Sequence, residues 1–471
     1  MNTSVHSNKG ALSRRHFCRN VAGLGAAALI TGPLIIPSRL LGADAPSNRI
    51  RIGHIGCGRI ARGHDMPGVF KSGLADYVAV CDLDSKRMKE GKELVEQFYR
   101  EAGKSAPKIS ESGDYREIFG RSDVDAVVLS LPDHQHAEVA IRALRAGKDV
   151  YLQKPFTMTH AESVLLRDEV AKSGRILQVG SQQRSWGETQ QFRKGCEFVR
   201  SGRVGQLRRV EIGLPIDPTK PDDPEQPVPA NLNYDAWLGP TPKVYYTEQR
   251  VHPQADYSRP GWLRNESYCL GMITGWGAHH FDIAHWGMDM EMGGPTKIEA
   301  RADFPTNSIW NVHGAYEIEL TYPGNVHLHV SDKLPNGIKF IGDEGWIFVS
   351  REPDAAQTAS DPKMRATALK PLDASDPKLL DPNGVSVKFP ESNSHHKNWL
   401  ECVKTRATPL SPAPIAHHAN TACIVSWIGM KLGRPLTWDP KAERFVGDDE
   451  ANRMLSRPER AGHGAVRLVK S

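Results

Sequence analysis

The stretch NRIRIGHIGCGRIA, residues 48–61, decides the fold class. Its first eight residues alternate with β-branched side chains, and a glycine turn follows at once. The spacing Gly56-x-Gly58-x-x-Ala61 is the one that dinucleotide binding requires. The first glycine permits a tight turn, the second lets the backbone approach a pyrophosphate, and the small third residue packs helix on strand. Because free N–H groups open the following helix, phosphates are expected there.

A second strand, DYVAVCD, ends in Asp82, which lies 24 residues after Gly58. An acidic residue roughly 20 residues beyond the glycines meets the adenosine ribose 2′-OH, and its charge repels a 2′-phosphate. The sequence therefore favours NAD over NADP as the cofactor. Lys86 and Arg87 lie close enough to weaken that preference.

Helix patterns and buried strands go on alternating up to about residue 180, which predicts a doubly wound parallel sheet covered on both faces. We assign residues 46–180 to this NAD-binding Rossmann domain. Its ligand should lie at the carboxyl ends of the strands, where His134 and His136 are expected to shape the loop over the nicotinamide ribose. The candidate cofactor-binding residues are Gly56, Gly58, Arg59, Ile60, Asp82, Leu131, Pro132, His136, Gln153, Lys154 and Gln182.

The rest of the chain predicts a second domain, residues 181–440, followed by a tail, 441–471. Residues 296–350 read as strand after strand, and returning helices follow residue 395. This pattern indicates an α+β domain built on an open mixed sheet.

A Pro-rich insertion, residues 214–266, interrupts the second domain. A stretch this long without periodicity is usually functional or disordered. Its rings can stack on sugar faces, while basic Arg259 and Arg264 can hold hydroxyls or an acidic group. An arm for oligomer contacts is the alternative, and both roles can hold together. The aromatic residues concerned are Trp237, Tyr245, Tyr246, Tyr257 and Trp262.

The N-terminus predicts export. Ser13-Arg14-Arg15-His16-Phe17 precedes a Gly/Ala-rich apolar run, and Ala43-Asp44-Ala45 reads as a small-x-small cleavage site. The run is shorter than the roughly 20 residues of a membrane span. We interpret residues 1–45 as a twin-arginine signal that delivers a folded, cofactor-loaded protein to the periplasm or otherwise exports it. An uncleaved apolar anchor is the alternative.

Composition bounds the partners. The net charge of +5 comes from 60 basic and 55 acidic residues. Because these are well mixed along the chain, no basic tract predicts binding to nucleic acid or, after signal cleavage, to a membrane. The six cysteines beyond the signal are scattered without paired spacing, so we expect buried thiols and no disulfides.

The glycine turn, the PDHQH loop (residues 132–136) and the sequence YLQKP (residues 151–155) resemble the Gfo/Idh/MocA family of sugar oxidoreductases. The resemblance implies a Rossmann domain followed by an open sheet, whose free face often makes a dimer or tetramer. It also implies that Lys154 and His279 flank the sugar carbon that exchanges hydride with the nicotinamide. Two positions depart from the family: its Glu before the lysine is Gln153 here, and the Asp four residues before the histidine is Gly275.

The chemistry of the same residues is consistent with that implication. Oxidation of a secondary alcohol needs a base, a nearby cation and a hydride acceptor. A histidine with a pKa of about 6.5 suits the base, and Lys154 supplies the charge. Because burial can lower a lysine pKa, the two roles are exchangeable from sequence alone.

The stretch MITGWGAHHFDIAHWGM, residues 272–288, leaves several roles open. On a helix His279, Asp282 and His285 would share a face and could bind a metal, or His280 and His285 could pack in the core. We predict no metal site. The pairs His395/His396 and His417/His418 have no carboxylate near them in sequence, so we interpret them as surface or helix-start residues. The candidate substrate-binding residues are Arg184, Trp262, His279 and His280.

Together these features predict an exported NAD-dependent oxidoreductase that acts on a secondary hydroxyl of a sugar or glycoside. Since no free nicotinamide pool exists outside the cytoplasm, we expect a tightly bound cofactor that is reoxidised in place, by a second substrate or by the sugar itself. A redox-neutral glycosidase, working through transient oxidation at C3 of the sugar, is one alternative. A non-catalytic sugar-binding relative is the other.

Overall fold

The structure is a computed structural model that describes residues 48–351 and 369–470. The predicted signal, residues 1–45, lies outside these ranges. From Arg49 onward the chain forms one compact unit. Within the described ranges, none of the helices is both long enough and apolar enough to cross a membrane.

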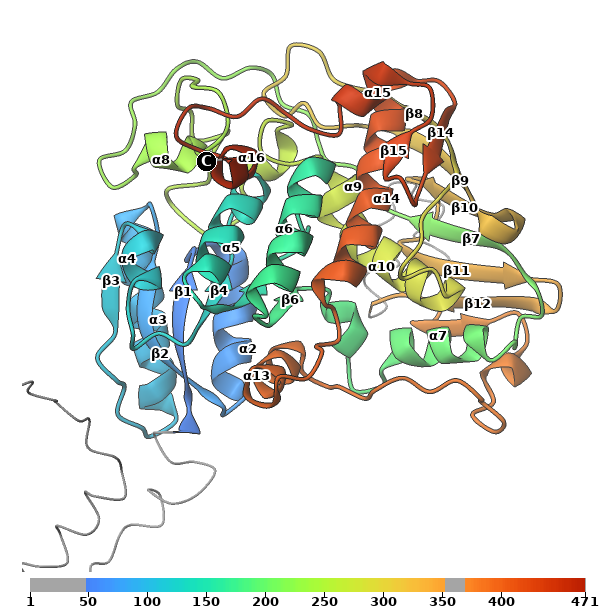
Figure 1. Cartoon of the computed structure of the whole chain (residues 1–471), viewed down its shortest axis with the longest axis horizontal. Coiled ribbons are helices and arrows are strands. Elements are labelled where there is room, and N and C mark those ends of the chain that lie inside the picture. Colours follow the sequence, from blue (N-terminus) through green and yellow to red (C-terminus); the bar gives the residue numbers. More distant parts are fainter. Residues whose placement is uncertain (1–47, 352–368, 471) are drawn as a thin grey trace, which may run out of the picture. The chain divides into compact units, whose positions relative to one another are not determined.

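The first sheet has six parallel strands in the order β3-β2-β1-β4-β5-β6 (Figure 1). This is the strand order of a dinucleotide-binding Rossmann fold, so the predicted doubly wound sheet is confirmed. The strands are β1 (Ile50–Ile55), β2 (Ala75–Cys81), β3 (Ser110–Ser112), β4 (Ala126–Leu129), β5 (Asp149–Leu152) and β6 (Leu177–Val179).

Helices cover both faces of this sheet. Along β4, Ala126 and Val128 face one hydrophobic cluster while Val127 and Leu129 face another, which explains why the strand is apolar throughout. The helices of this region are η3 (Ala61–Asp65), α2 (Met66–Lys71), α3 (Ser85–Glu101), α4 (Tyr115–Phe119), η4 (Asp133–Gln135), α5 (His136–Arg145) and α6 (His160–Ser173).

The second sheet is mixed and has nine strands in the order β13-β12-β11-β7-β10-β9-β8-β14-β15. β7 and β10 run parallel, whereas the other neighbours are antiparallel. The open mixed sheet is as predicted, but its central strand β7 was not. The strands are β7 (Leu207–Gly213), β8 (Lys297–Ala302), β9 (Tyr316–Tyr322), β10 (Val326–Ser331), β11 (Gly337–Gly342), β12 (Gly345–Val349), β13 (Leu372–Ala374), β14 (Leu436–Asp439) and β15 (Arg444–Phe445).

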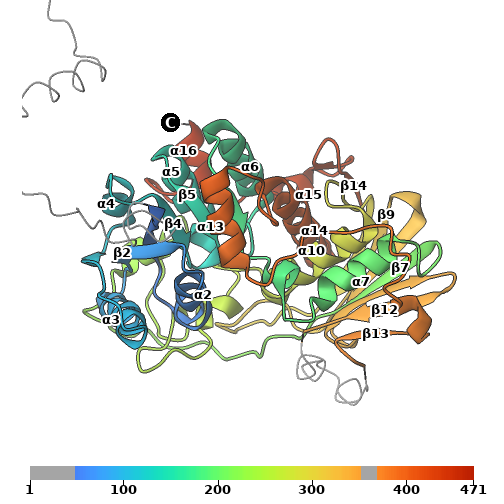
Figure 2. The same cartoon turned by 90° about the horizontal axis from the view of Figure 1, so that it is seen from below.

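Helices pack on one face of the second sheet (Figure 2). The other face carries alternating charged residues, as the period of two along β9 requires: Glu317 and Glu319 lie between buried Tyr316, Ile318 and Leu320. The packing helices are α7 (Gln191–Arg200), α10 (Gly277–Met288) and α14 (Ala413–Leu432), and α9 (Met272–Gly275) contacts α10 and α14.

Late segments of the chain return to the first sheet. Trp399 and Leu400 of α13 join the core beside α2, and Ala465 of α16 joins the core on the α5–α6 side (Figure 1). The Rossmann unit therefore takes residues from beyond the predicted boundary at 180. The remaining helices are η5 (Gln182–Ser185), α8 (Tyr234–Leu238), η6 (Gly261–Arg264), η7 (Pro323–Asn325), η8 (Pro377–Leu380), α13 (His395–Thr405), α15 (Asp449–Arg453) and α16 (Ala465–Lys470).

The Pro-rich insertion has its own small core. Trp237 and Tyr246 are buried there with Val251 and Tyr268. These two rings are therefore core residues of the insertion, although Trp237 also lines the cavity described below. The six cysteines from Cys57 onward are buried and unpaired, as the sequence predicts.

Candidate functional site

A cavity of about 450 Å³ opens at the carboxyl ends of β1, β2, β4 and β5. This volume is typical of a small-molecule site, and its place is where nucleotide folds bind their ligands. Its lining includes Gly56, Gly58, Arg59, Ile60, Asp82, Arg87, Leu131, Pro132, Asp133, Gln153, Lys154, Trp262, Gly275, His279 and Arg351.

The glycine turn fits a dinucleotide. Gly56 has φ +89°, and a Cβ there would lie 2.4 Å from the Ser130 carbonyl oxygen. A Cβ on Gly58 would meet nothing within 4 Å, so this backbone is open to the cavity. The backbone N–H of Cys57 donates to Asp82 Oδ2 at 2.6 Å, which fixes that carboxylate at the end of β2. These residues would hold the pyrophosphate and the adenosine ribose.

The insertion forms a strap, which we define as residues 252–263, across the β2 end of this cavity. His252 Nε2 lies 3.0 Å from Asp84 Oδ2, and Arg87 donates to the carbonyl oxygens of Pro253 and Asp256. Beyond these contacts Ser258, Arg259, Pro260, Trp262 and Leu263 line the cavity. The strap therefore joins the cavity wall to the first turn of α3.

Lys154 stands at the opposite end of the cavity, after β5. Its Nζ donates to the Gly275 carbonyl oxygen at 2.8 Å. Burial lowers the pKa of Lys154 to about 8, and the Asp133 carboxylate opposes that shift. In turn, burial raises the pKa of Asp133 to about 7 while Lys154 lowers it. The amine is therefore poised to exchange a proton near neutral pH.

His279 lies on α10 and is 4% exposed. Its Nδ1 is buried without a hydrogen-bond partner. Burial, together with Arg351 and Lys154, holds the pKa of His279 well below 6.5. The imidazole is thus neutral at working pH and can form a hydrogen bond to a substrate hydroxyl.

Two family descriptions match the chain and cover most of it. An oxidoreductase family with an NAD-binding Rossmann fold matches residues 50–181, and the C-terminal alpha/beta domain of the same family matches residues 219–361 and 377–465. The chain belongs to the Gfo/Idh/MocA oxidoreductase family. Its first domain binds NAD, and its relatives include sugar oxidoreductases.

Two curated relatives show the range of this family. The chain is 30% identical over 179 residues to dTDP-3,4-didehydro-2,6-dideoxy-alpha-D-glucose 3-reductase from Actinomadura kijaniata, which spans 38% of this chain and 49% of the relative. It is 29% identical over 163 residues to a glycosyl hydrolase family 109 protein from Shewanella pealeana, spanning 31% and 34%. Each match thus covers half or less of the relative's length.

A solved structure shares the fold. The WlbA dehydrogenase from Bordetella pertussis, in complex with NADH and UDP-GlcNAcA, superposes with a TM-score of 0.58. The sequences are 16% identical, and the match covers 83% of this chain and 98% of that one. At this identity the likeness concerns the fold alone.

In this oxidoreductase the family's missing Glu has a structural explanation. The Gln153 amide Nε2 donates to Asp65 Oδ1 at 2.7 Å, and Asp65 is fully buried. A glutamate at 153 would place two carboxylates in contact, which is costly without water. Asp65 therefore supplies a buried carboxylate next to the position where the family carries one.

The second departure leaves room at the site. A Cβ on Gly275 would meet nothing within 4 Å, and the residue lines the cavity. Among the described acidic residues, Asp82 and Asp133 line the same cavity, and Asp133 is the one that interacts with Lys154. Its Oδ2 is buried without a partner. Asp133 thus provides a carboxylate near Lys154, whereas Gly275 has no side chain to do so.

Several predicted site residues lie elsewhere. The predictions that Arg184 and His280 contact substrate disagree with the structure, because neither lines the cavity. Arg184 forms a bidentate ion pair with Asp282 at 2.7 and 2.9 Å. His280 bonds to Asn336, Gln183 and the Trp276 indole.

Two predicted cofactor residues are also outside the cavity lining. His136 lies between the carbonyl oxygens of Pro155 and Leu131, at 2.7 and 3.0 Å, and so holds the two cofactor loops together. Gln182 donates to the Tyr151 hydroxyl. Both residues therefore position neighbouring residues of the cofactor domain and do not line the cavity.

The metal alternative for the α10 histidines does not hold. Asp282 is committed to Arg184, and His285 Nε2 lies 2.8 Å from the Tyr322 hydroxyl. His285 is therefore a core histidine, as one interpretation of the sequence has it, with Nε2 bonded and Nδ1 buried without a hydrogen-bond partner. The sequence places Asp133 in a loop expected to hold the ligand but gives it no role of its own, and it gives no signal for Arg351; both line the cavity.

The Lys154–Asp133 pair predicts the pH dependence of substrate oxidation. If neutral Lys154 takes the hydroxyl proton, the initial rate should rise with pH and level off above about 8. In Asp133→Asn the charge that keeps Lys154 protonated is gone. The midpoint of the rate profile should therefore move to lower pH. A midpoint that stays in place or rises would show that Asp133 does not act on Lys154.

Proposed function

We propose that the protein oxidises a secondary hydroxyl of a sugar or glycoside with an NAD that stays bound through turnover. The strap carries this proposal. It closes over the adenosine end of the cavity and is fastened to Asp84, Lys86 and Arg87. We infer that these contacts slow the release of a bound cofactor. The polar and aromatic lining at the other end suits a sugar.

The residues divide the work as follows. Gly56, Gly58 and Asp82 would hold NAD, which would supply the hydride acceptor for the sugar carbon. Lys154 Nζ takes the hydroxyl proton, because its lowered pKa makes the neutral amine accessible. Neutral His279 orients the same hydroxyl from α10. Arg259 and Arg351 add positive charge to the lining, which favours an anionic or phosphorylated substituent on the sugar.

Retention of the cofactor depends on Arg87. Its two charge-assisted bonds to Pro253 and Asp256 each contribute about 1.5–3 kcal/mol in a typical protein. We expect Arg87→Ala to speed NAD release roughly 10- to 100-fold, whereas wild type keeps its NAD through repeated desalting. Nucleotide content after timed dialysis measures this. Arg100→Ala, an exposed arginine on the same helix, is the matched control. Equal rates of NAD release from wild type and the two variants would refute a role of the strap in retaining NAD.

Redox-neutral glycoside cleavage is the second candidate. Transient oxidation at C3 acidifies the C2 hydrogen, so that the C1 substituent can leave by elimination. Water then adds at C1 and a proton returns to C2 before the C3 ketone is reduced again. The named activity of the Shewanella pealeana relative, a glycosyl hydrolase, supports it, and so does a cofactor that stays bound. Stoichiometric release of free aglycone with no net change in bound NAD distinguishes this reaction.

We further propose export by the twin-arginine route, on the motif Ser13 to Phe17. Replacing both arginines 14 and 15 by lysine should leave the protein in the cytoplasmic fraction.

We also propose that the charged face of the second sheet, with Arg209, Glu319 and His329, meets a second copy. Light scattering on the eluting protein tests this. A monomer would refute it.

A further inference from the structure

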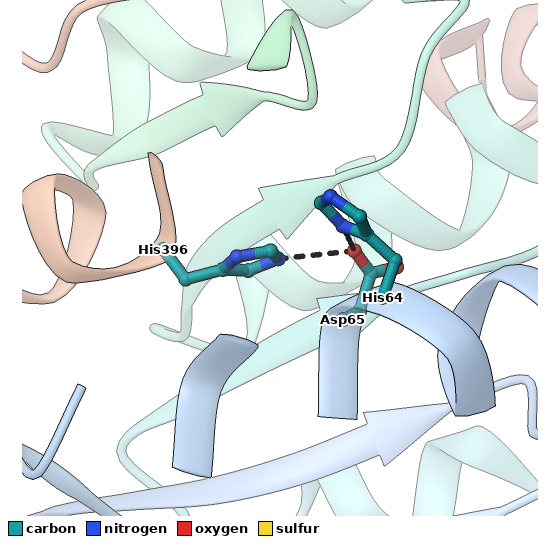
Figure 3. Close-up of side chains that lie close together, drawn as sticks. All are labelled: His64, Asp65 and His396. Atoms are coloured by element: carbon teal, nitrogen blue, oxygen red, sulfur yellow. Dashed lines mark hydrogen bonds and ion pairs between the residues drawn. The ribbon is translucent and has the colours of Figure 1, made fainter. Parts of the chain in front are cut away.

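Two histidines and an aspartate converge beside the cofactor domain (Figure 3). His64 and Asp65 come from η3, and His396 comes from α13. His396 Nε2 lies 3.0 Å and His64 Nδ1 3.4 Å from the same atom, Asp65 Oδ1. One nitrogen of each ring and a carboxylate oxygen lie within 4.8 Å of one another. Figure 3 shows both imidazoles directed at this oxygen.

The hydrogen bonds of this cluster converge on one oxygen atom, Asp65 Oδ1. Oδ1 also accepts from Gln153 Nε2 at 2.7 Å, so three donors meet one oxygen that has two lone pairs. The His64 contact, at 3.4 Å, is long for a hydrogen bond. A cation between the three groups would give both imidazole nitrogens and the carboxylate a direct partner.

Neighbouring residues fix the orientation of Asp65 and His396, as is usual for metal ligands. The Ser130 hydroxyl donates to Asp65 Oδ2 at 2.7 Å. Tyr151 stacks on His396 with ring centroids 4.6 Å apart. A Cβ at Gly68 would lie 2.3 Å from His396 Nδ1, so only glycine leaves room for this ring. Asp65 and His396 are buried, while the His64 side chain is 37% exposed and leaves a route for an ion.

We propose that His64, Asp65 and His396 bind one divalent transition metal ion of the zinc type. Two imidazoles and one carboxylate are the donor set that Zn²⁺ accepts, with a further position open to water. Because Asp65 and His396 are 331 residues apart in sequence, the ion clamps α13 to the cofactor domain. The sequence prediction that His396 is a surface or helix-start residue is thereby corrected: it starts α13 but is buried against Asp65.

A second cluster, His417, His418 and Glu443, lacks this capacity. Arg167 Nη1 lies 3.1 Å from both Glu443 oxygens and from His417 Nε2. The guanidinium already occupies the place of a cation and would repel another. This cluster therefore offers a matched control.

The test uses the mature chain, stripped with a chelator and titrated with ZnCl₂ alone. We expect one Zn²⁺ per chain and a higher unfolding temperature, since a ligand that binds the folded state stabilises it. His64→Ala, a partly exposed position, should weaken Zn²⁺ binding at least roughly 100-fold. His418→Ala should leave the affinity unchanged. Co²⁺ added to the wild type should give visible d–d bands, which needs no variant.

Three outcomes would overturn the proposal. They are no stoichiometric binding and no thermal shift, equal Zn²⁺ affinity in His64→Ala and wild type, or loss of binding in His418→Ala instead. None of these readouts depends on sugar turnover. The metal proposal therefore stands or fails separately from the proposed oxidoreductase activity.

Discussion

Lys154→Met is expected to lower the rate of substrate-dependent reduction of bound NAD by about 10³-fold. The substitution removes the proton acceptor and the only lysine in the cavity lining of the described chain. General base catalysis is typically worth 10²- to 10⁴-fold. Methionine keeps the length and apolar stem of the side chain. Single-turnover absorbance near 340 nm measures the rate.

Two variants make this result specific. Lys154→Arg keeps a positive charge but has no accessible neutral form, so it should be nearly as slow as Lys154→Met. Lys92→Met is the control, at a partly exposed lysine paired with Glu111, and should turn over normally. If Lys154→Arg were fast, the charge and not the proton transfer would be the contribution of Lys154. If Lys154→Met were fast, both roles would be excluded.

Gln153→Glu, which restores the residue typical of the family, is expected to destabilise the metal-free protein by roughly 3 kcal/mol at neutral pH. The new carboxylate would lie where the amide now donates to Asp65 at 2.7 Å. Removing one partner of a buried polar pair and leaving an unpaired charge commonly costs this much. The midpoint of urea denaturation in the presence of a chelator measures the change.

A double-mutant cycle identifies the cause. Asp65→Asn combined with Gln153→Glu again pairs an amide with a carboxylate, so the double variant should be more stable than the sum of the two single changes predicts, by about 2 kcal/mol. Additive effects would mean that residues 65 and 153 do not act on each other. A Gln153→Glu protein as stable as wild type would contradict the explanation given for the missing family glutamate.

The parts of the fold that the sequence predicts are those determined by local pattern. The glycine turn, the alternation of helices and strands to residue 180 and the strands from 296 onward all carry periodicity within a short window. β7 escaped because Arg208, Arg209 and Glu211 interrupt an otherwise apolar run. In the structure Arg209 pairs with Glu211 and Glu319 on the open face, and Arg208 is exposed near the start of the strand and pairs with Asp343, which is why a central strand tolerates these charges.

The site shows the same division. Lys154, His279, Asp82 and the glycines line one cavity because each ends a predicted strand or begins a helix. Arg184 does not, because its partner Asp282 lies 98 residues away and pairs with it in the core. Asp65, which explains Gln153, likewise meets His396 only through the tertiary fold. Pairings over such separations leave no trace in a single sequence.

The most direct test of a retained cofactor that oxidises a sugar uses the protein purified without added nucleotide. Absorbance near 340 nm is recorded while sugars and glycosides are added one at a time. We predict that bound NAD is present and that one class of sugar makes the band rise, either lastingly or with decay as free aglycone appears. If no nucleotide co-purifies and none binds when supplied, the account of this cavity is wrong.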